Sequence, residues 1–137
     1  YEKLLSEVVG TEDDVRRELF GDNAIVRAAI AYEDEAPVGF ALYFFNFSTF
    51  LTRRGLYLED LYIEPEYRGK GYGKALIQYL AREAAKNGCG RFEWVVLEWN
   101  KPAIGFYKKI GAQIMEDWRI CRVAGDALQR LAQTGED

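Results

Sequence analysis

A glycine-rich turn at residues 69–73 constrains the fold more than any other feature of this chain. It reads Gly-Lys-Gly-Tyr-Gly and lies between a strand pattern, "LYLEDLYIEP", that ends at Pro65 and a helical pattern that follows at once. The helical pattern predicts a helix over residues 71–86, because its apolar side chains recur at helical spacing. Such a turn needs backbone that adopts positive φ and approaches other groups closely, and glycine permits both.

Strand and helix patterns alternate along the whole chain. Strands are predicted at residues 24–33, 38–48, 56–65 and 91–99, with one or two closing strands within 113–123. Helices are predicted at residues 11–21, 71–86, 100–111 and 125–134. This alternation favours an α/β or α+β fold built on a mixed sheet. A chain of 137 residues has the length of one domain, so residues 1–137 are predicted to form a single domain.

The composition excludes several classes of protein. A net charge of −4 disfavours a nucleic-acid-binding protein and leaves room for a cationic partner. The chain has no histidine, the commonest general base and metal ligand, so no metal is expected. Its two cysteines, Cys89 and Cys121, lack the spacing of a zinc site or a disulfide framework, which favours a reducing compartment such as the cytoplasm. The longest apolar run, "FALYFF", is too short to cross a bilayer, so no membrane partner is expected.

The glycine-rich turn has the physical properties of an anion site. A helix that begins there presents unpaired N–H groups and the positive end of its dipole. Arg68, Lys70 and Lys74 add three cations to this part of an acidic chain. A diphosphate would suit such a turn, and an ordinary strand-to-helix turn with solvated lysines is the alternative.

The familiar phosphate-binding loops do not match this spacing. A Walker loop requires a serine or threonine after its lysine, but Lys74 is followed by Ala75, which disfavours a nucleotide-hydrolysing enzyme. The dinucleotide and kinase fingerprints require Gly-x-Gly-x-x-Gly, and the spacing here is one residue shorter.

Two motifs resemble those of the GNAT family of N-acetyltransferases. Arg68-x-x-Gly71-x-Gly73 is similar to that family's Arg/Gln-x-x-Gly-x-Gly/Ala signature, which also lies between a strand and the long central helix. The later segment "NKPAIGFYKKIGA" resembles the family's helix that follows an asparagine, carries Phe-Tyr and ends at a glycine. The stretches "YLEDLYIEPEYRGKGYG" and "EWNKPAIGFYKKIGA" resemble the diamine (spermidine/spermine) and thialysine branch. The likeness runs from Tyr1 to about Ala132, and the family's first strand and helix would precede Tyr1.

The resemblance implies a fold and a donor. The fold would be a mixed, mostly antiparallel sheet flanked by helices, with acetyl-CoA in a cleft where two neighbouring parallel strands separate. The diphosphate would rest on backbone N–H groups of residues 69–74, and the backbone of residues 61–63 would pair with the pantetheine arm like another strand. The residues implied to contact acetyl-CoA are Leu61, Tyr62, Ile63, Arg68, Gly69, Lys70, Gly71, Tyr72, Gly73, Lys74, Asn100, Lys101, Pro102 and Ala103.

The resemblance also implies catalytic residues. Tyr107 would be the general acid for the departing CoA thiolate, and Phe106 beside it would pack the helix. Glu59 would hold the amine and accept its proton, directly or through a water. Asp60 is expected to point to the opposite face of the strand, because side chains alternate along a strand. The residues implied to bind the amine substrate are Tyr1, Glu2, Glu59, Glu93, Trp94 and Val95.

The leading hypothesis is therefore an enzyme that acetylates a small diamine or polyamine through a ternary complex. One alternative is an acetyltransferase for lysine-like amino acids such as thialysine, or for peptide amines. An amino-acid substrate would also need a cation for its α-carboxylate, and the sequence assigns none. A second alternative is a CoA-binding sensor without turnover, which would need neither Tyr107 nor Glu59. Members of the resembling branch are usually homodimers, so a homodimer is expected.

Overall fold

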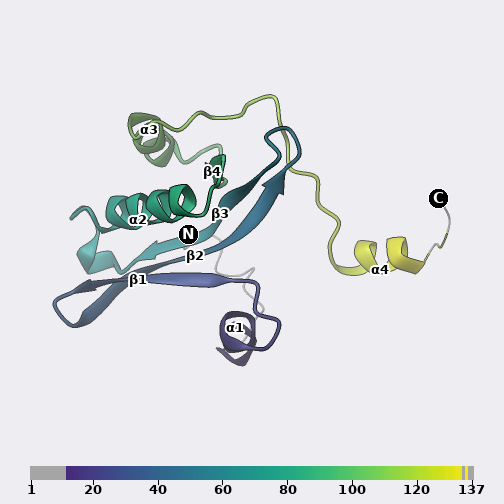
Figure 1. The fold of residues 1–137 in the computed structure, drawn as a ribbon, viewed down its shortest axis with the longest axis horizontal. Helices are drawn as coiled ribbons and strands as arrows, with labels where there is room; N and C mark the ends of the chain where they lie inside the picture. The colour runs from purple at the N-terminus through teal and green to yellow at the C-terminus, as the bar shows by residue number, and fades with distance from the viewer. Residues whose placement is uncertain (1–11, 134, 136–137) are drawn as a thin grey trace. The chain divides into compact units, whose positions relative to one another are not determined.

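A computed structural model describes residues 12–133 and 135 of the chain, which divides into two compact units between Val95 and Val96. Figure 1 shows the elements in chain order. The first unit contains α1 (Glu12–Phe20), β1 (Arg27–Glu33), β2 (Ala36–Ser48), β3 (Arg53–Ile63), a 3-10 turn (Pro65–Tyr67), α2 (Tyr72–Lys86) and β4 (Arg91–Glu93). The second unit contains α3 (Lys101–Lys109) and α4 (Gly125–Gln133).

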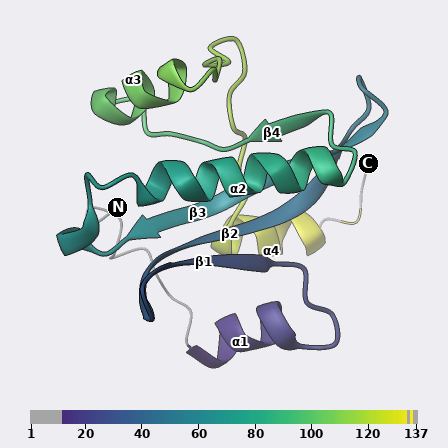
Figure 2. The same ribbon diagram turned by 60° about the vertical axis from the view of Figure 1, so that its left-hand side comes forward.

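The sheet of the first unit has the strand order β1-β2-β3-β4 (Figure 2). β1, β2 and β3 pair antiparallel as two consecutive hairpins. β4 pairs parallel with β3, because α2 carries the chain back before β4 begins. The prediction of a mixed, mostly antiparallel sheet with one parallel pair is confirmed.

α2 covers one face of this sheet and builds the core there (Figures 1 and 2). Its buried side chains recur at helical spacing and pack on the strand residues that point to the same side. The buried cluster consists of Ala41, Tyr43, Leu56, Leu58, Leu76, Leu80 and Ala84. The opposite face is called the far face below and carries the alternate strand residues, which include Phe40, Phe44, Tyr57 and Tyr62.

A β-bulge interrupts the pairing of β2 with β3. Leu42 pairs with Asp60 and Tyr43 pairs with Leu58, so Glu59 is the extra residue on β3. Beyond the bulge, Gly39 of β2 lies opposite Ile63. A Cβ atom on Gly39 would lie 2.6 Å from the Tyr62 carbonyl oxygen, so only glycine lets β2 approach the end of β3 this closely.

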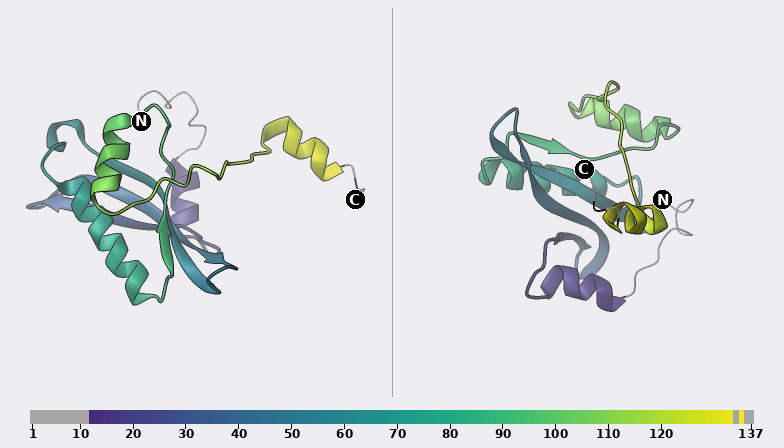
Figure 3. Two further views of the ribbon diagram at one scale, coloured as in Figure 1. Left: turned by 90° about the horizontal axis from the view of Figure 1, so that it is seen from above. Right: turned by 90° about the vertical axis from the view of Figure 1, so that its right-hand side faces the viewer.

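Most predicted elements are confirmed, and two predictions are wrong. The strand predicted at 91–99 is only three residues long, since β4 ends at Glu93. The closing strands predicted within 113–123 do not form: the structure describes this segment as chain without strand pairing, between α3 and α4 (Figure 3). Alternating apolar residues satisfied the pattern, but a strand also needs a neighbour for its N–H and C=O groups. Among the described residues, no helix is long and apolar enough to span a membrane.

Candidate active site

The glycine-rich turn forms an open cradle at the start of α2. Gly69 and Gly71 have φ angles of 79° and 91°, in the left-handed region that favours glycine. Apart from the adjacent residues in the chain, no heavy atom of the described residues lies within 4 Å of the position that a Cβ would occupy on either residue, so the backbone is open from that side. Gly71 is the N-cap of α2 and provides no side-chain cap, which leaves the first N–H groups of the helix for another acceptor. The turn therefore fits a diphosphate.

Side chains around the cradle hold it in place. Arg68 Nε donates to the Ile63 carbonyl oxygen at 2.9 Å, and its guanidinium lies 5.6 Å from the centre of the Tyr62 ring. Arg68 thereby ties the turn to the end of β3. The ring of Tyr72 packs edge-on against Tyr67, with 6.3 Å between centroids, and Lys70 Nζ lies 5.2 Å from the centre of the Tyr67 ring.

β3 extends well beyond the residues that pair with β4. β4 pairs with β3 only from Gly55 to Tyr57, whereas β3 continues to Ile63. Its other edge is paired with β2 as far as Ile63. The ladder between β3 and β4 thus stops at Tyr57, and an extended ligand can pair with a strand edge as an added strand.

The far face carries carboxylates around Tyr57. Glu59 lies two residues after Tyr57 on β3, and Glu93 is the direct neighbour of Tyr57 on β4. Burial raises the pKa of the Tyr57 hydroxyl, and the negative charges of Glu59 and Glu93 raise it further. Both carboxylates therefore act on the same hydroxyl, although they come from different strands.

Asp60 lies on this face too, and the prediction that it points away from Glu59 is wrong. Leu58 and Leu61 both pack in the core under α2, although three positions separate them along β3. The two residues between them consequently share the far face, because the bulge at Glu59 interrupts the usual alternation. Burial raises the pKa of the Asp60 carboxyl. Two adjacent carboxylates can therefore serve one cation.

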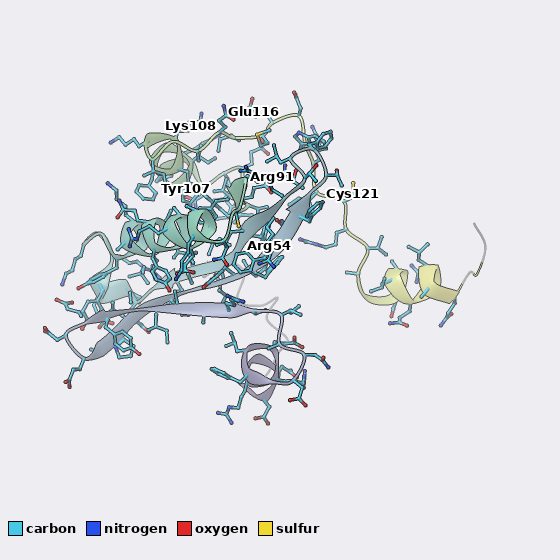
Figure 4. The ribbon with its side chains drawn as sticks, in the orientation of Figure 1. Arg54, Arg91, Tyr107, Lys108, Glu116 and Cys121 are labelled. Atoms are coloured by element: carbon cyan, nitrogen blue, oxygen red, sulfur yellow. The ribbon has the colours of Figure 1, made fainter. Side chains whose placement is uncertain are left out.

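The second unit holds the remaining predicted residues. Asn100 is the N-cap of α3, and its Oδ1 accepts a hydrogen bond from Ala103 N at 3.4 Å, with Lys101 and Pro102 between them. Tyr107 lies on α3 (Figure 4), its ring 5.7 Å from that of Phe106. Burial raises the pKa of the Tyr107 hydroxyl, which keeps it a neutral proton donor at physiological pH.

The structure divides the predicted site residues into groups. The cradle and the end of β3 are adjacent in the first unit, and Glu59 and Glu93 share the far face. Trp94 instead packs against the core, with its ring 4.9 Å from that of Phe92, whereas Val95 is exposed. Tyr1 and Glu2 lie outside the described residues.

Sequence reasoning missed three residues of the far face: Tyr57, Asp60 and Arg91. The signal for Arg91 was available, since it precedes Glu93 by two positions and so shares its face of a strand. Regular alternation along a strand excludes Asp60 from the face that carries Glu59, and no sequence pattern reveals the bulge that interrupts this alternation. In the part of the chain that the structure describes, no group of three or more cysteine, aspartate or glutamate side chains is arranged to hold a metal ion.

Comparisons with known proteins agree with this geometry. The model of the acetyltransferase (GNAT) family matches residues 3–112. The chain is 40% identical to the thialysine N-epsilon-acetyltransferase of Sus scrofa, over 96% of this chain and 84% of that protein. It is 47% identical to the L-ornithine N5-acetyltransferase of Arabidopsis thaliana over 72% of this chain, but spans only 43% of that relative's length. Among solved structures, an integron cassette protein from the mobile metagenome of V. cholerae superimposes with a TM-score of 0.83 at 29% identity, covering 97% of this chain and 85% of that one.

Proposed function

The chain belongs to the acetyltransferase (GNAT) family, and from this membership we propose that it transfers an acetyl group from acetyl-CoA to the primary amine of a small diamine or basic amino acid. The observation that carries the proposal is the pairing of a backbone-built anion cradle at Gly69–Gly71 with carboxylates on the far face of the adjoining strand. The cradle suits a diphosphate, and the carboxylates suit an ammonium group.

On the donor side, the chain supplies mainly backbone groups. The N–H groups at the start of α2 would bind the diphosphate, with Lys70 and Lys74 adding positive charge. The backbone of residues 61–63, beyond the end of the β3–β4 ladder, would hold the pantetheine arm, and its position depends on Gly39 and Arg68. The resemblance to the family also implies contacts of Asn100 to Ala103 with acetyl-CoA. When bound, acetyl-CoA supplies the activated thioester.

On the acceptor side, the energetic problem is the charge of the amine. An alkyl ammonium with a pKa near 10.4 is neutral only about once in 2,500 molecules at pH 7, a penalty of roughly 4.6 kcal/mol. Glu59 would hold the ammonium and accept its proton, directly or through one water. Asp60, on the same face, would add a second negative charge.

Transfer then proceeds in one ternary complex. The amine nitrogen bonds to the thioester carbonyl carbon, the C–S bond breaks, and Tyr107 donates a proton to the departing sulfur. The second proton that the nitrogen loses as the amide forms restores the Tyr107 hydroxyl through solvent. With an ordinary tyrosine pKa near 10 and a thiol pKa near 8.5, full transfer is uphill by about 2 kcal/mol. Burial of Tyr107 raises its pKa further, so the step requires a desolvated and therefore more basic thiolate. Neither Cys89 nor Cys121 is needed as an acyl carrier.

Both substrate classes have support. The carboxylates of the far face suit any small polycation, including a diamine or polyamine. The names of two relatives favour the amino-acid class, since ornithine and thialysine each combine an α-amino-acid group with a side-chain amine. We also propose that the protein acts in the cytoplasm as a homodimer, which the resemblance to the branch supports.

The test is release of free thiol from acetyl-CoA with spermidine, putrescine, lysine, ornithine and thialysine as acceptors. We expect amine-dependent release that falls at least about tenfold in Tyr107→Phe, which removes only the proton donor. Tyr79→Phe, on α2, is the matched control and should leave the rate unchanged. Binding of CoA without turnover of any amine would refute the proposal and favour a sensor.

A further inference from the structure

Arg91 and Glu93 form an ion pair on the far face, beside the carboxylate that the proposed reaction uses. Arg91 Nε lies 3.1 Å from Glu93 Oε1, and both side chains are about two-fifths exposed, at 39% and 40%. Figure 4 labels Arg91 on β4. A bond through Nε uses one edge of the guanidinium, so the outer edge formed by the two terminal nitrogens is the one that suits a carboxylate.

The sheet register places this pair at a defined distance from Glu59. Arg91 pairs with Gly55 and Glu93 pairs with Tyr57, which is two residues before Glu59. A strand advances about 3.3 Å per residue and neighbouring strands lie about 4.8 Å apart, so the Cα atoms of Glu59 and Glu93 are about 8 Å apart. The side-chain nitrogen of a basic amino acid lies roughly 5–6 Å from its α-carbon along four or five bonds. A basic amino acid can therefore span from Glu59 to the ion pair.

The Arg91 side chain lies beside Gly55 of the neighbouring strand. Arg91 Cγ lies 3.6 Å from the position that a Cβ on Gly55 would occupy, so the stem of Arg91 packs over β3. Asn46 packs over the same glycine, and its Oδ1 is buried without a hydrogen-bond partner among the described residues. A buried acceptor of this kind is unusual in a folded protein.

An ion pair discriminates between the two substrate classes of the proposed function. The second ammonium of a diamine would meet the Glu93 carboxylate, whose charge Arg91 already offsets. It would also lie close to the like charge of the Arg91 guanidinium. The α-amino-acid group carries both charges, so its ammonium can bind Glu93 while its carboxylate binds the outer edge of Arg91. The sequence alone assigned no cation to this role.

We propose that Arg91 is the specificity-determining residue of this protein and selects a basic α-amino acid over the corresponding diamine by pairing with its α-carboxylate. The inference rests on the proposed acetyltransferase function and assigns its substrate class. Glu59 would then receive the side-chain amine, and Glu93 would bind the α-ammonium.

The test compares acceptors that differ only in the α-carboxylate: ornithine against putrescine, and lysine against cadaverine. We expect the protein to prefer the amino acid in each pair. In Arg91→Met, which keeps a long apolar stem, kcat/KM for ornithine should fall about 10- to 100-fold, mainly through KM, as expected for loss of a charge-assisted bidentate contact. The value for putrescine should stay within about twofold or rise, because a like charge has been removed. Arg91→Lys should recover part of the loss, and Arg82→Met on α2 should change neither substrate.

Two results would overturn the inference: a wild-type preference for the diamines, or equal losses for ornithine and putrescine in Arg91→Met. If no amine is turned over, the proposed function fails, and calorimetric titration of ornithine and putrescine into the CoA-bound protein decides the inference separately. Ornithine binding that weakens at least about tenfold in Arg91→Met, with putrescine unaffected, would support it. Equal binding by the two proteins would refute it.

Discussion

The cradle at the start of α2 and the far face of the sheet are built in opposite ways. The cradle occupies seven consecutive residues, Arg68 to Lys74, and its working groups are backbone N–H groups. The far-face site uses side chains from β3 and β4, and it depends on a bulge that shifts β3 against β2. The first is local in sequence, whereas the second exists only after the sheet has formed.

This difference predicts that the two regions control different parts of the reaction. Changes in the cradle should alter the affinity for acetyl-CoA, since every acetyl transfer uses the same diphosphate. Changes on the far face should alter the kinetics of the amine, since only the acceptor lies there. This division would be contradicted by a cradle variant that changes the kinetics of the amine, or by a far-face variant that changes the affinity for acetyl-CoA.

The largest effect is expected for Glu59→Gln. This change keeps the size of the side chain but removes the proton acceptor and a negative charge, so kcat/KM for the amine should fall about 100-fold or more. Steady-state kinetics should show the Michaelis constant for acetyl-CoA unchanged. Glu83→Gln on α2 is the matched control. A loss of less than about threefold would remove Glu59 from the catalytic step.

An intermediate effect is expected in the cradle, where two glycines provide an internal control. Gly71→Ala places a Cβ on a residue with φ of 91° and should reduce the free energy of unfolding by about 1 kcal/mol. It should also raise the Michaelis constant for acetyl-CoA about tenfold as the turn changes shape. Gly73 does not have a positive φ, and a Cβ there would lie 3.9 Å from Ile63 Cγ1, an ordinary contact. Thermal melts and kinetics should therefore find Gly73→Ala close to wild type, and equal losses in both variants would contradict the role assigned to backbone conformation.

The smallest effect is expected for Asp60→Asn. Burial raises the pKa of Asp60 in the folded protein, so the folded state binds its proton more readily than the unfolded state. Ionised Asp60 therefore costs stability above its folded pKa; that cost begins to shrink as the pH falls through this value and is gone below the lower pKa of the unfolded state. Asp60→Asn should raise the free energy of unfolding at pH 7 by less than about 1 kcal/mol, with a difference that shrinks toward pH 4.

The same variant should raise the Michaelis constant for the amine only a few fold, because Glu59 remains. Urea titrations at several pH values measure the stability difference, and amine kinetics measure the second effect. A variant less stable than wild type at pH 7 would show that Asp60 is held by a favourable interaction and not merely buried.

Sequence patterns predicted helices α2 and α3 well, because periodicity and turn residues act locally. α2 begins at Tyr72 and ends at Lys86, within one residue of the predicted range, and Asn100 and Gly111 enclose α3 as expected. The wrong predictions concern strands, at residues 91–99 and within 113–123, because a strand forms only where a neighbouring strand pairs with it. The segment containing Trp118 and Ile120 alternates like a strand, yet alternation does not provide a neighbouring strand.

For the candidate site, the sequence by itself determined the cradle, because three glycines and the start of a helix specify its chemistry within a few residues. Only the tertiary structure decided the far face. Glu59 and Asp60 share it because the bulge interrupts alternation, and Arg91 joins them because a parallel strand returns beside β3 after α2. Register between strands depends on packing over the whole sheet, so no local pattern could have placed these side chains together.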